Sequence, residues 1–295
     1  MKEIFNYSTW QMFGNGSIVL KQHGVNLVLN YYCGPTVNAA RGLANQIEQA
    51  IQQFSGNFMM AINPQITQSY AKGDYDYTTQ LVNKGARFSF YIMWIISLPV
   101  IINAEFILGV WLKDVPAYTV IFLQLTLINT LVEVIKKPLV IAQNATGVVR
   151  NCQISIGLIG LLNVPLCFII MWLGAHPYDV VLISIVISIV SIFVWLYFLK
   201  ITIHRFKPKD FIANVILKIS IVTTCSSIFP VLVKQYVGEG WPSFVFSSLT
   251  AFMCCVIIIW FSMENNERMF VLSFVKKRLR NLTNYAKNNF DKHSI

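Results

Sequence analysis

Apolar runs of about 20 residues recur along the chain, and this is the length that an α-helix needs to cross a lipid bilayer. Five runs are apolar throughout and cover residues 90–112, 154–175, 180–199, 215–233 and 243–261. Three other stretches, at about residues 10–32, 36–62 and 117–143, place polar residues at helical spacing among apolar ones. The pattern therefore predicts an all-α integral membrane protein with about eight transmembrane helices.

The second of these amphipathic stretches has one polar face. Asn38, Arg41, Asn45, Glu48 and Gln52 follow one another at steps of three or four residues, so that they lie on the same side of a helix. A charged side chain at the bilayer centre costs about 2.5–3.5 kcal/mol on insertion scales. We therefore expect Arg41 and Glu48 to face protein or a water-filled cavity rather than lipid.

The two other amphipathic stretches have polar faces of the same kind, and three such helices in one bundle can enclose a single polar chamber. The residues that we expect to line it are Lys21, His23, Asn26, Arg41, Asn45, Glu48, Glu133, Lys136 and Lys137. One alternative is that these side chains only join helices through hydrogen bonds, which would suit the asparagines in particular. A second alternative is that the third amphipathic span ends near Ile135, which would place Lys136 and Lys137 at the cytoplasmic surface of the membrane.

The charge of the expected lining indicates the kind of ligand. Its four basic and two acidic side chains give a net charge of +2, which favours an anionic ligand. The amide side chains would also suit a carbohydrate, because an amide can both donate hydrogen bonds to hydroxyl groups and accept them.

The basic residues of the whole chain are divided unequally between the two sides of the membrane. Only 12% of the residues are charged, and the net charge is +10. With eight spans, 18 of the 23 lysines and arginines fall on one set of alternate connections, three fall on the other set and two lie within spans. This asymmetry predicts that both termini are cytoplasmic. It also accounts for the net charge without a nucleic-acid partner.

Motifs of enzymes and metal sites are either missing from the sequence or poorly placed. The DxD pattern at Asp74 and Asp76, which holds a metal-bound sugar nucleotide in some glycosyltransferases, follows Gly73 in a predicted turn without a soluble catalytic domain. The sequence has no HExxH, GxSxG or phosphate-binding Gly-rich motif, and its six cysteines form no CxxC pair. We therefore predict that the protein is not an enzyme and needs neither a cofactor nor a metal.

Three runs of sequence also carry a resemblance to a known family: QHGVNLVLNYYCGPTVNAARGLANQI, NFMMAINPQITQSYAKGD and AQNATGVVRNCQISIGLIGLLNVP. From about residue 10 to residue 261, the chain resembles the O-antigen type, Wzx-like polysaccharide repeat-unit flippases of the multidrug/oligosaccharidyl-lipid/polysaccharide exporter superfamily. The resemblance implies that a lipid-pyrophosphate-linked oligosaccharide crosses the bacterial inner membrane by alternating access of two helical lobes, for the biosynthesis of lipopolysaccharide or another surface polysaccharide. It also implies that Lys21, Arg41 and Glu48 lie on the cavity-facing helices of a lobe.

The chain departs from that family in its length, because such flippases have two lobes of six helices, often followed by two more helices. The resemblance is to the C-terminal lobe only, which implies a six-helix lobe at residues 1–200, two additional transmembrane helices at 201–262 and a basic cytoplasmic tail at 263–295. Expected partners are the lipid-linked oligosaccharide, membrane lipid, and either a missing N-terminal lobe or a second membrane subunit.

Two other functions fit the same sequence. The first is that of a cation-coupled small-molecule exporter of the same superfamily, in which Glu48 or Glu133 would exchange a proton or a sodium ion. The net charge of +2 on the expected lining argues against cationic drugs as its cargo. The second is that of a transport-incompetent fragment, which the missing lobe favours.

Overall fold

The computed structural model describes residues 2–238, 240–264 and 267–269, so most of the predicted tail at 263–295 lies outside the described residues. Every regular element in this part of the chain is a helix. The helices are α1 (Lys2–Ala71), α2 (Tyr75–Ile102), α3 (Ala104–Trp111), α4 (Thr119–Ala145), α5 (Arg150–Leu161), α6 (Asn163–Trp172), α7 (Asp179–Thr202), α8 (Pro208–Phe211), the π-helical η1 (Ile212–Leu217), α9 (Lys218–Val237) and α10 (Trp241–Ser262).

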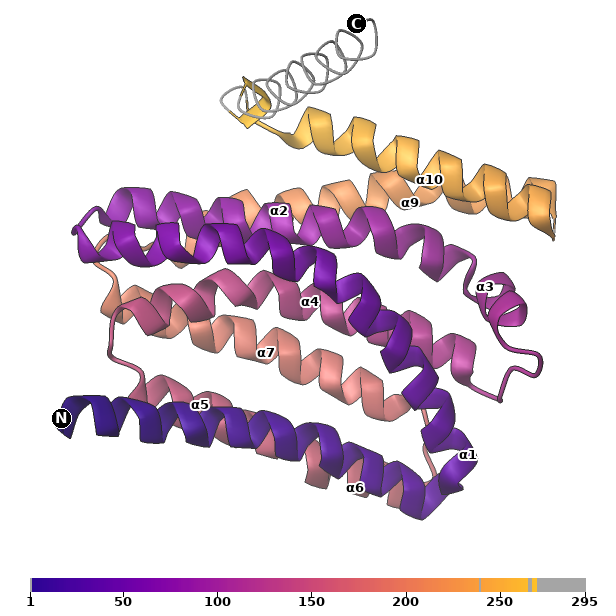
Figure 1. Ribbon diagram of the computed structural model, residues 1–295, viewed down its shortest axis with the longest axis horizontal. Helices are drawn as coiled ribbons and strands as arrows, with labels where there is room; N and C mark the ends of the chain where they lie inside the picture. The colour runs from indigo at the N-terminus through magenta and orange to yellow at the C-terminus, as the bar shows by residue number, and fades with distance from the viewer. Residues whose placement is uncertain (1, 239, 265–266, 270–295) are drawn as a thin grey trace, which may run out of the picture.

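Helix α1 consists of two arms that meet at Gly34. The φ of 80° and ψ of 177° at Gly34 are not helical, and a positive φ of this size favours glycine. Pro35 follows and has no N–H to continue the hydrogen-bond ladder. The chain therefore reverses its direction here, and the two arms form a V (Figure 1). They correspond to the two amphipathic helices predicted at about 10–32 and 36–62.

Six helical stretches are long and apolar enough to cross a membrane: residues 75–102, 119–145, 150–172, 179–202, 208–237 and 241–262. Within them, α5 and α6 together form one span, and α8, η1 and α9 together form another. Each arm of α1 has more than 30 residues, and a rise of about 1.5 Å per residue makes it longer than the roughly 30 Å hydrocarbon core. The chain is a multi-pass, all-α integral membrane protein with six candidate spans among the described residues, and that the two arms of α1 cross as well, which would make eight spans, stays a prediction.

One predicted span differs from the structure. The apolar run at 90–112 is not one helix, because α2 begins at Tyr75 and ends at Ile102, and the short α3 follows after Asn103. The first half of α2 contains Lys84 and Arg87, and these charges lower its hydropathy, although the structure provides Arg87 with acidic partners. Asn103 ends α2 by donating a side-chain hydrogen bond to the Pro99 carbonyl at 3.0 Å.

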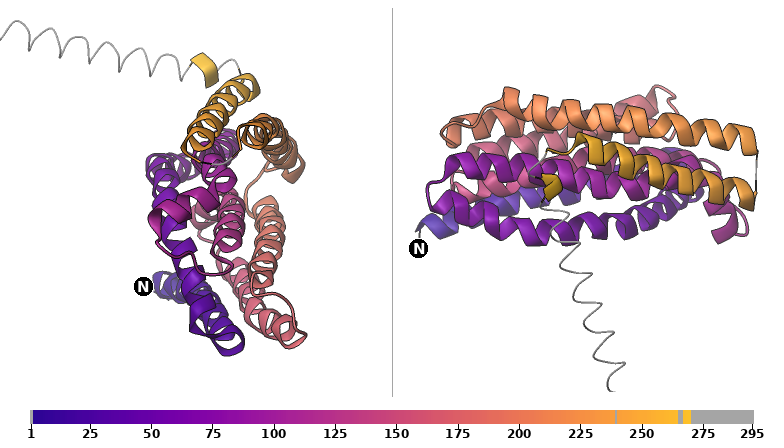
Figure 2. Two further views of the ribbon diagram at one scale, coloured as in Figure 1. Left: turned by 90° about the vertical axis from the view of Figure 1, so that its right-hand side faces the viewer. Right: turned by 90° about the horizontal axis from the view of Figure 1, so that it is seen from above.

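Small residues let the N-terminal arm of α1 lie close to α5 and α6. A Cβ atom at Gly24 would lie 2.5 Å from the side chain of Val164, and one at Gly157 would lie 2.6 Å from the ring of Phe13. Membrane helices commonly use such residues to bring their backbones together. The second arm of α1 packs instead against α2 and α4, and α7 contacts α4, α5 and α6 (Figures 1 and 2). The two arms therefore belong to different parts of the bundle.

Helices α9 and α10 pack against α2 through a row of polar contacts. Trp94 donates a hydrogen bond from Nε1 to Ser226 at 2.8 Å, and Ser247 donates one to Oδ1 of Asn103 at 3.0 Å. Where α10 ends, Arg87 forms an ion pair with Glu267 that leaves each side chain only 3% exposed. These contacts attach the last two spans to the rest of the bundle.

A second acidic residue joins this cluster from outside the membrane-spanning segments. Lys218 donates a hydrogen bond to Glu264 at 2.9 Å, and this bond holds the pKa of the Glu264 carboxyl below its usual value. Glu264 also lies 3.7 Å from Arg87, so the buried arginine has two carboxylates near it. The pairing explains how a guanidinium can be buried in α2.

The pair of Arg87 and Glu267 gives a prediction on stability. Replacing Glu267 by alanine leaves a buried arginine without its nearest carboxylate, so we expect a loss of about 3–5 kcal/mol. Thermal unfolding of the purified protein in detergent measures the loss. Arg205 and Asp76 form the matched control, because their ion pair is 69% and 62% exposed and its removal should cost less than about 1 kcal/mol. Equal effects of the two substitutions, Glu267→Ala and Asp76→Ala, would contradict the prediction.

The orientation in the membrane also stays a prediction, and it rests on the division of basic residues. Reporter domains fused after Gly73 and after Lys209 should both give a cytoplasmic signal. A fusion after His176 should give a periplasmic signal, because α6 and α7 meet at the opposite end of the bundle (Figure 1). The same signal from all three fusions would exclude the eight-span topology.

Candidate functional site

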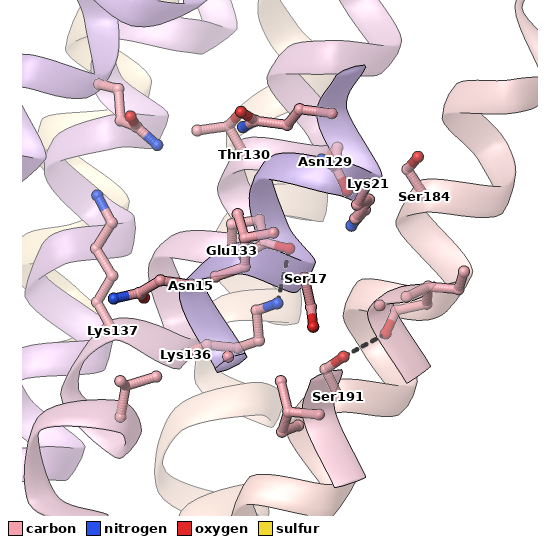
Figure 3. A pocket seen from close by; sticks show the side chains of 18 of the residues that line it. Asn15, Ser17, Lys21, Asn129, Thr130, Glu133, Lys136, Lys137, Ser184 and Ser191 are labelled. Carbon is pink, nitrogen blue, oxygen red and sulfur yellow. Dashed lines mark hydrogen bonds and ion pairs between the residues drawn. The ribbon is translucent and has the colours of Figure 1, made fainter. Parts of the chain in front are cut away.

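A polar cavity lies between the two arms of α1. Its volume is about 870 Å³, and side chains from both arms of α1 and from α4, α5 and α7 line it. All nine candidate residues are part of this lining: Lys21, His23, Asn26, Arg41, Asn45, Glu48, Glu133, Lys136 and Lys137. The structure thus brings together the three polar faces, as Figure 3 shows for part of the cavity. That these residues meet a substrate is a separate prediction.

The two lysines of α4 lie within a helix that is long and apolar enough to cross a membrane. Helix α4 continues to Ala145, so Lys136 is about 13 Å from its end at a rise of 1.5 Å per residue. Lys136 and Lys137 both line the cavity. Where the membrane surface crosses α4 stays a prediction.

Glu133 is the most fully paired charge of the cavity. Its Oε1 accepts a hydrogen bond from Nζ of Lys136 at 2.6 Å and another from Oγ of Ser188 at 2.5 Å. Figure 3 shows Lys136 and Glu133 pointing toward one another along α4. Because Ser188 belongs to α7, the carboxylate also joins α4 to α7.

The second carboxylate of the cavity, that of Glu48, has a different environment. Its Oε1 accepts a hydrogen bond from Oγ1 of Thr130 at 2.8 Å, which connects the second arm of α1 to α4. Lys137 is close enough to interact with Glu48 electrostatically, but the two do not form an ion pair. Glu48 is therefore hydrogen-bonded to a neutral group rather than to a cation.

Three cations of the cavity form no ion pair within the part of the chain that the structure describes. They are Lys21, Arg41 and Lys137. Arg41 donates a hydrogen bond from Nη1 to Oδ1 of Asn26, which joins the two arms of α1. Lys21 lies within electrostatic range of Arg41, Glu133 and Lys136. The middle of the cavity thus has more positive than negative charge.

Neutral amides join helices at one end of the cavity. Gln11 donates a hydrogen bond to Oδ1 of Asn144 at 2.8 Å, and Gln153 donates one to Oε1 of Gln11 at 3.0 Å. These bonds connect the N-terminal arm of α1 to α4 and α5. The interpretation of amides as links between helices therefore holds at this end, whereas the charged residues line open space.

Helix α7 also contributes to the lining, which the hydropathy pattern did not predict. Ser184, Ser188 and Ser191 lie on one face of this otherwise apolar helix, at steps of four and three residues. Ser184 and Ser191 line the cavity, and Ser188 bonds to Glu133. A hydropathy window hides this face, because serine scarcely lowers the mean of a helix rich in isoleucine and valine. The spacing of the three serines could have revealed it.

A polar cavity enclosed by membrane-spanning helices is typical of membrane transport proteins. The chain belongs to the MatE family, whose sequence model matches residues 13–169. Members of this family are exporters of the multidrug/oligosaccharidyl-lipid/polysaccharide superfamily and not enzymes, which implies a role in membrane transport. No curated protein and no solved structure shows significant similarity to the chain.

The matched region covers most of the elements that form the cavity. Residues 13–169 include α2 to α5, both arms of α1 except the first turns, and most of α6. All nine candidate residues lie within it, whereas the serines of α7 lie outside it. The family match supports export in general, and it is equally consistent with a flippase and with a cation-coupled exporter.

The second arm of α1 gives a prediction about access to water. Asn45 and Gln52 line the cavity, whereas Ile47 packs against the apolar core and Ile51 is buried. In a protein without its native cysteines, single cysteines at positions 45 and 52 should react with a small membrane-impermeant thiosulfonate reagent, and those at 47 and 51 should not. The readout is later labelling by a fluorescent maleimide after denaturation. Equal protection at all four positions would favour a dry contact between helices.

Proposed function

We propose that the protein translocates lipid-pyrophosphate-linked oligosaccharide repeat units across the bacterial inner membrane, for the biosynthesis of surface polysaccharide such as O-antigen. The observation that carries the proposal is the set of three cations, Lys21, Arg41 and Lys137, that line the cavity without an ion pair among the described residues. A pyrophosphate linkage would supply the missing negative charge. Charge-assisted hydrogen bonds between phosphate oxygens and lysine or arginine are among the stronger polar contacts in proteins.

The shape of the lining supports a ligand with a charged part and a neutral polar part. On the N-terminal arm of α1, the lining runs from Gln11 to Asn26, a distance of about 22 Å at 1.5 Å per residue. Lys21 lies toward the bend of the V, and the amides of Gln11, Asn144 and Gln153 lie toward the other end. A pyrophosphate near Lys21 would leave room for sugars beside the amides, which can exchange hydrogen bonds with hydroxyl groups.

Transport by this route needs more than the cavity of one lobe. We propose that residues 1–200 form a six-helix exporter lobe, that residues 201–262 are an additional pair of spans, and that residues 263–295 are a cytoplasmic tail. The partner would be an N-terminal lobe or a second membrane subunit that covers the open side of the cavity, with membrane lipid around both. Both termini would face the cytoplasm of the bacterial cell.

A cation-coupled exporter of small molecules is the second candidate function. The observation that favours it is the environment of Glu48, whose carboxylate is hydrogen-bonded to Thr130 and has no ion pair among the described residues. Such a group could bind and release a proton or a sodium ion. The excess of positive charge in the cavity argues against a cationic cargo, and for this reason we favour the flippase. A chain that forms the same lobe but does not transport is the third candidate.

The proposal predicts that export depends on the unpaired cations. In the native host, replacing Lys21 or Arg41 by alanine on the chromosome should reduce surface glycan at least about tenfold, because each change removes a charged partner of the pyrophosphate. Immunoblots or glycan gels measure the export, and a membrane blot checks that the protein accumulates normally. Arg41→Lys should retain part of the activity if charge alone matters, and little if the planar guanidinium is required.

Gln46 and Gln53 provide controls on the same arm of α1. Both side chains are exposed and neither lines the cavity, so their alanine variants should export glycan normally. Normal export by the Lys21→Ala and Arg41→Ala variants would refute the cationic cavity as the substrate route. Loss of drug efflux instead of glycan export, in a Glu48→Gln variant, would favour the second candidate.

A further inference from the structure

We infer that Glu133 is a built-in counter-anion, which occupies the place of a substrate phosphate while the cavity is empty, so that only an anion able to form more than one new ion pair binds appreciably. The inference rests on the proposed function, because it concerns how the same cavity distinguishes one anion from another. It assigns Glu133 a role in specificity that is different from that of Glu48.

The position of Glu133 among the cations is the first argument. Its carboxylate forms the one ion pair of the cavity within the described residues, with Lys136 at 2.6 Å. Lys21 is a second cation within electrostatic range of the same carboxylate, and Lys137 is a third. A carboxylate in this position meets the same cations that a bound phosphate would meet.

The way in which Glu133 is held is the second argument. Lys136 is three residues further along α4, so the pair forms within one helix and does not depend on how the arms of α1 are placed. Ser188 of α7 fixes the same oxygen at 2.5 Å. The side chain of Glu133 remains 33% exposed in the cavity, whereas that of Lys136 is only 11% exposed. The Glu133 side chain is therefore more open to the cavity than the Lys136 side chain with which it pairs.

Competition between anions follows from this arrangement. A ligand with one phosphate group can replace the carboxylate of Glu133 at Lys136, but it gains little because one ion pair is exchanged for another. A diphosphate can pair with Lys136 and with Lys21 or Arg41 at once, so its gain exceeds the cost of displacing Glu133. That cost is the same for both ligands, so Glu133 lowers both affinities by the same factor, and only the diphosphate retains appreciable binding.

The Glu48 side chain provides a control with the same change of charge. Glu48 lines the same cavity, but its hydrogen bond is to Thr130 and not to a lysine. Glu133→Gln and Glu48→Gln each raise the charge of the lining by one. An effect of net charge alone would have the same size in both variants, whereas the release of Lys136 from Glu133 would make the effect of Glu133→Gln the larger one for each phosphate.

The test is binding of prenyl phosphates to the purified protein in detergent micelles, measured by microscale thermophoresis. The probes are farnesyl diphosphate, farnesyl monophosphate, and farnesol as the uncharged reference. We expect the unsubstituted protein to bind the diphosphate more tightly than the monophosphate. Glu133→Gln should tighten binding of both phosphates by about tenfold, or about 1.4 kcal/mol, because neither has to displace a carboxylate from Lys136. Glu48→Gln should tighten both by the same factor of about two.

A second variant weakens the hold on Glu133 without changing the charge of the cavity, so that the inference does not depend on one substitution. Ser188→Ala removes one hydrogen bond to the Glu133 carboxylate without altering any charge. Displacing the carboxylate should then be easier, so that binding of both phosphates tightens by about twofold to threefold. Unchanged affinities for both phosphates in Glu133→Gln and Ser188→Ala would overturn the inference.

Two further measurements separate this inference from the proposed function. If Lys21→Ala weakens binding of farnesyl diphosphate while Glu133→Gln tightens binding no more than Glu48→Gln does, the cationic cavity stands and the counter-anion does not. If the unsubstituted protein binds both farnesyl phosphates no better than farnesol, both proposals fail. Inorganic diphosphate tests whether the prenyl chain contributes to binding. We expect it to bind more weakly than farnesyl diphosphate, and equal affinity would contradict a lipid-linked substrate.

Discussion

The cost of placing charges in a bilayer determines how this bundle is built. The chain has six charged side chains in the lining of one cavity, contributed by both arms of α1 and by α4. None of them could face lipid without a penalty of a few kcal/mol. The bend at Gly34 allows two polar faces of one continuous segment to oppose one another across the cavity, and α4 brings in the third. The fold thus keeps these charged side chains away from lipid, because they all point into the cavity between the helices.

A second solution to the same problem is found on α2. Arg87 is buried, and it is neutralised by Glu267 rather than exposed to a cavity. The difference lies in what each arrangement permits. Arg87 and Glu267 are both buried in their ion pair, and this pair holds α2 to the segment that follows α10. The cations of the cavity instead leave charge available for an external anion, and this difference is the physical reason to look for function between the arms of α1 and not beside α2.

The sequence was sufficient for the helical class and for the residues of the polar faces. Periodicity predicted that Arg41, Asn45 and Glu48 share a face, and the covalent continuity of a helix makes that kind of inference robust. The partners of these residues could not be predicted, because they depend on how helices distant in the sequence pack together. The bond between Glu133 and Ser188 joins positions 55 residues apart, and hydropathy gave no sign of it. The first half of α2 was missed for the same reason, since Glu267 compensates Arg87 from 180 residues away.

The hydrogen bonds across the cavity also bear on how such a bundle can move. Arg41 with Asn26 joins the two arms of α1, Glu48 with Thr130 joins the second arm to α4, and Gln11 with Asn144 joins the first arm to α4. Each bond connects side chains rather than backbones, and each partner can exchange its bond for one to water or to a ligand at a small net cost. The contacts at Gly24 and Gly157, by contrast, are tight packing that cannot be exchanged in this way. Opening of the cavity would therefore break the polar contacts between the arms and keep the first arm of α1 together with α5 and α6.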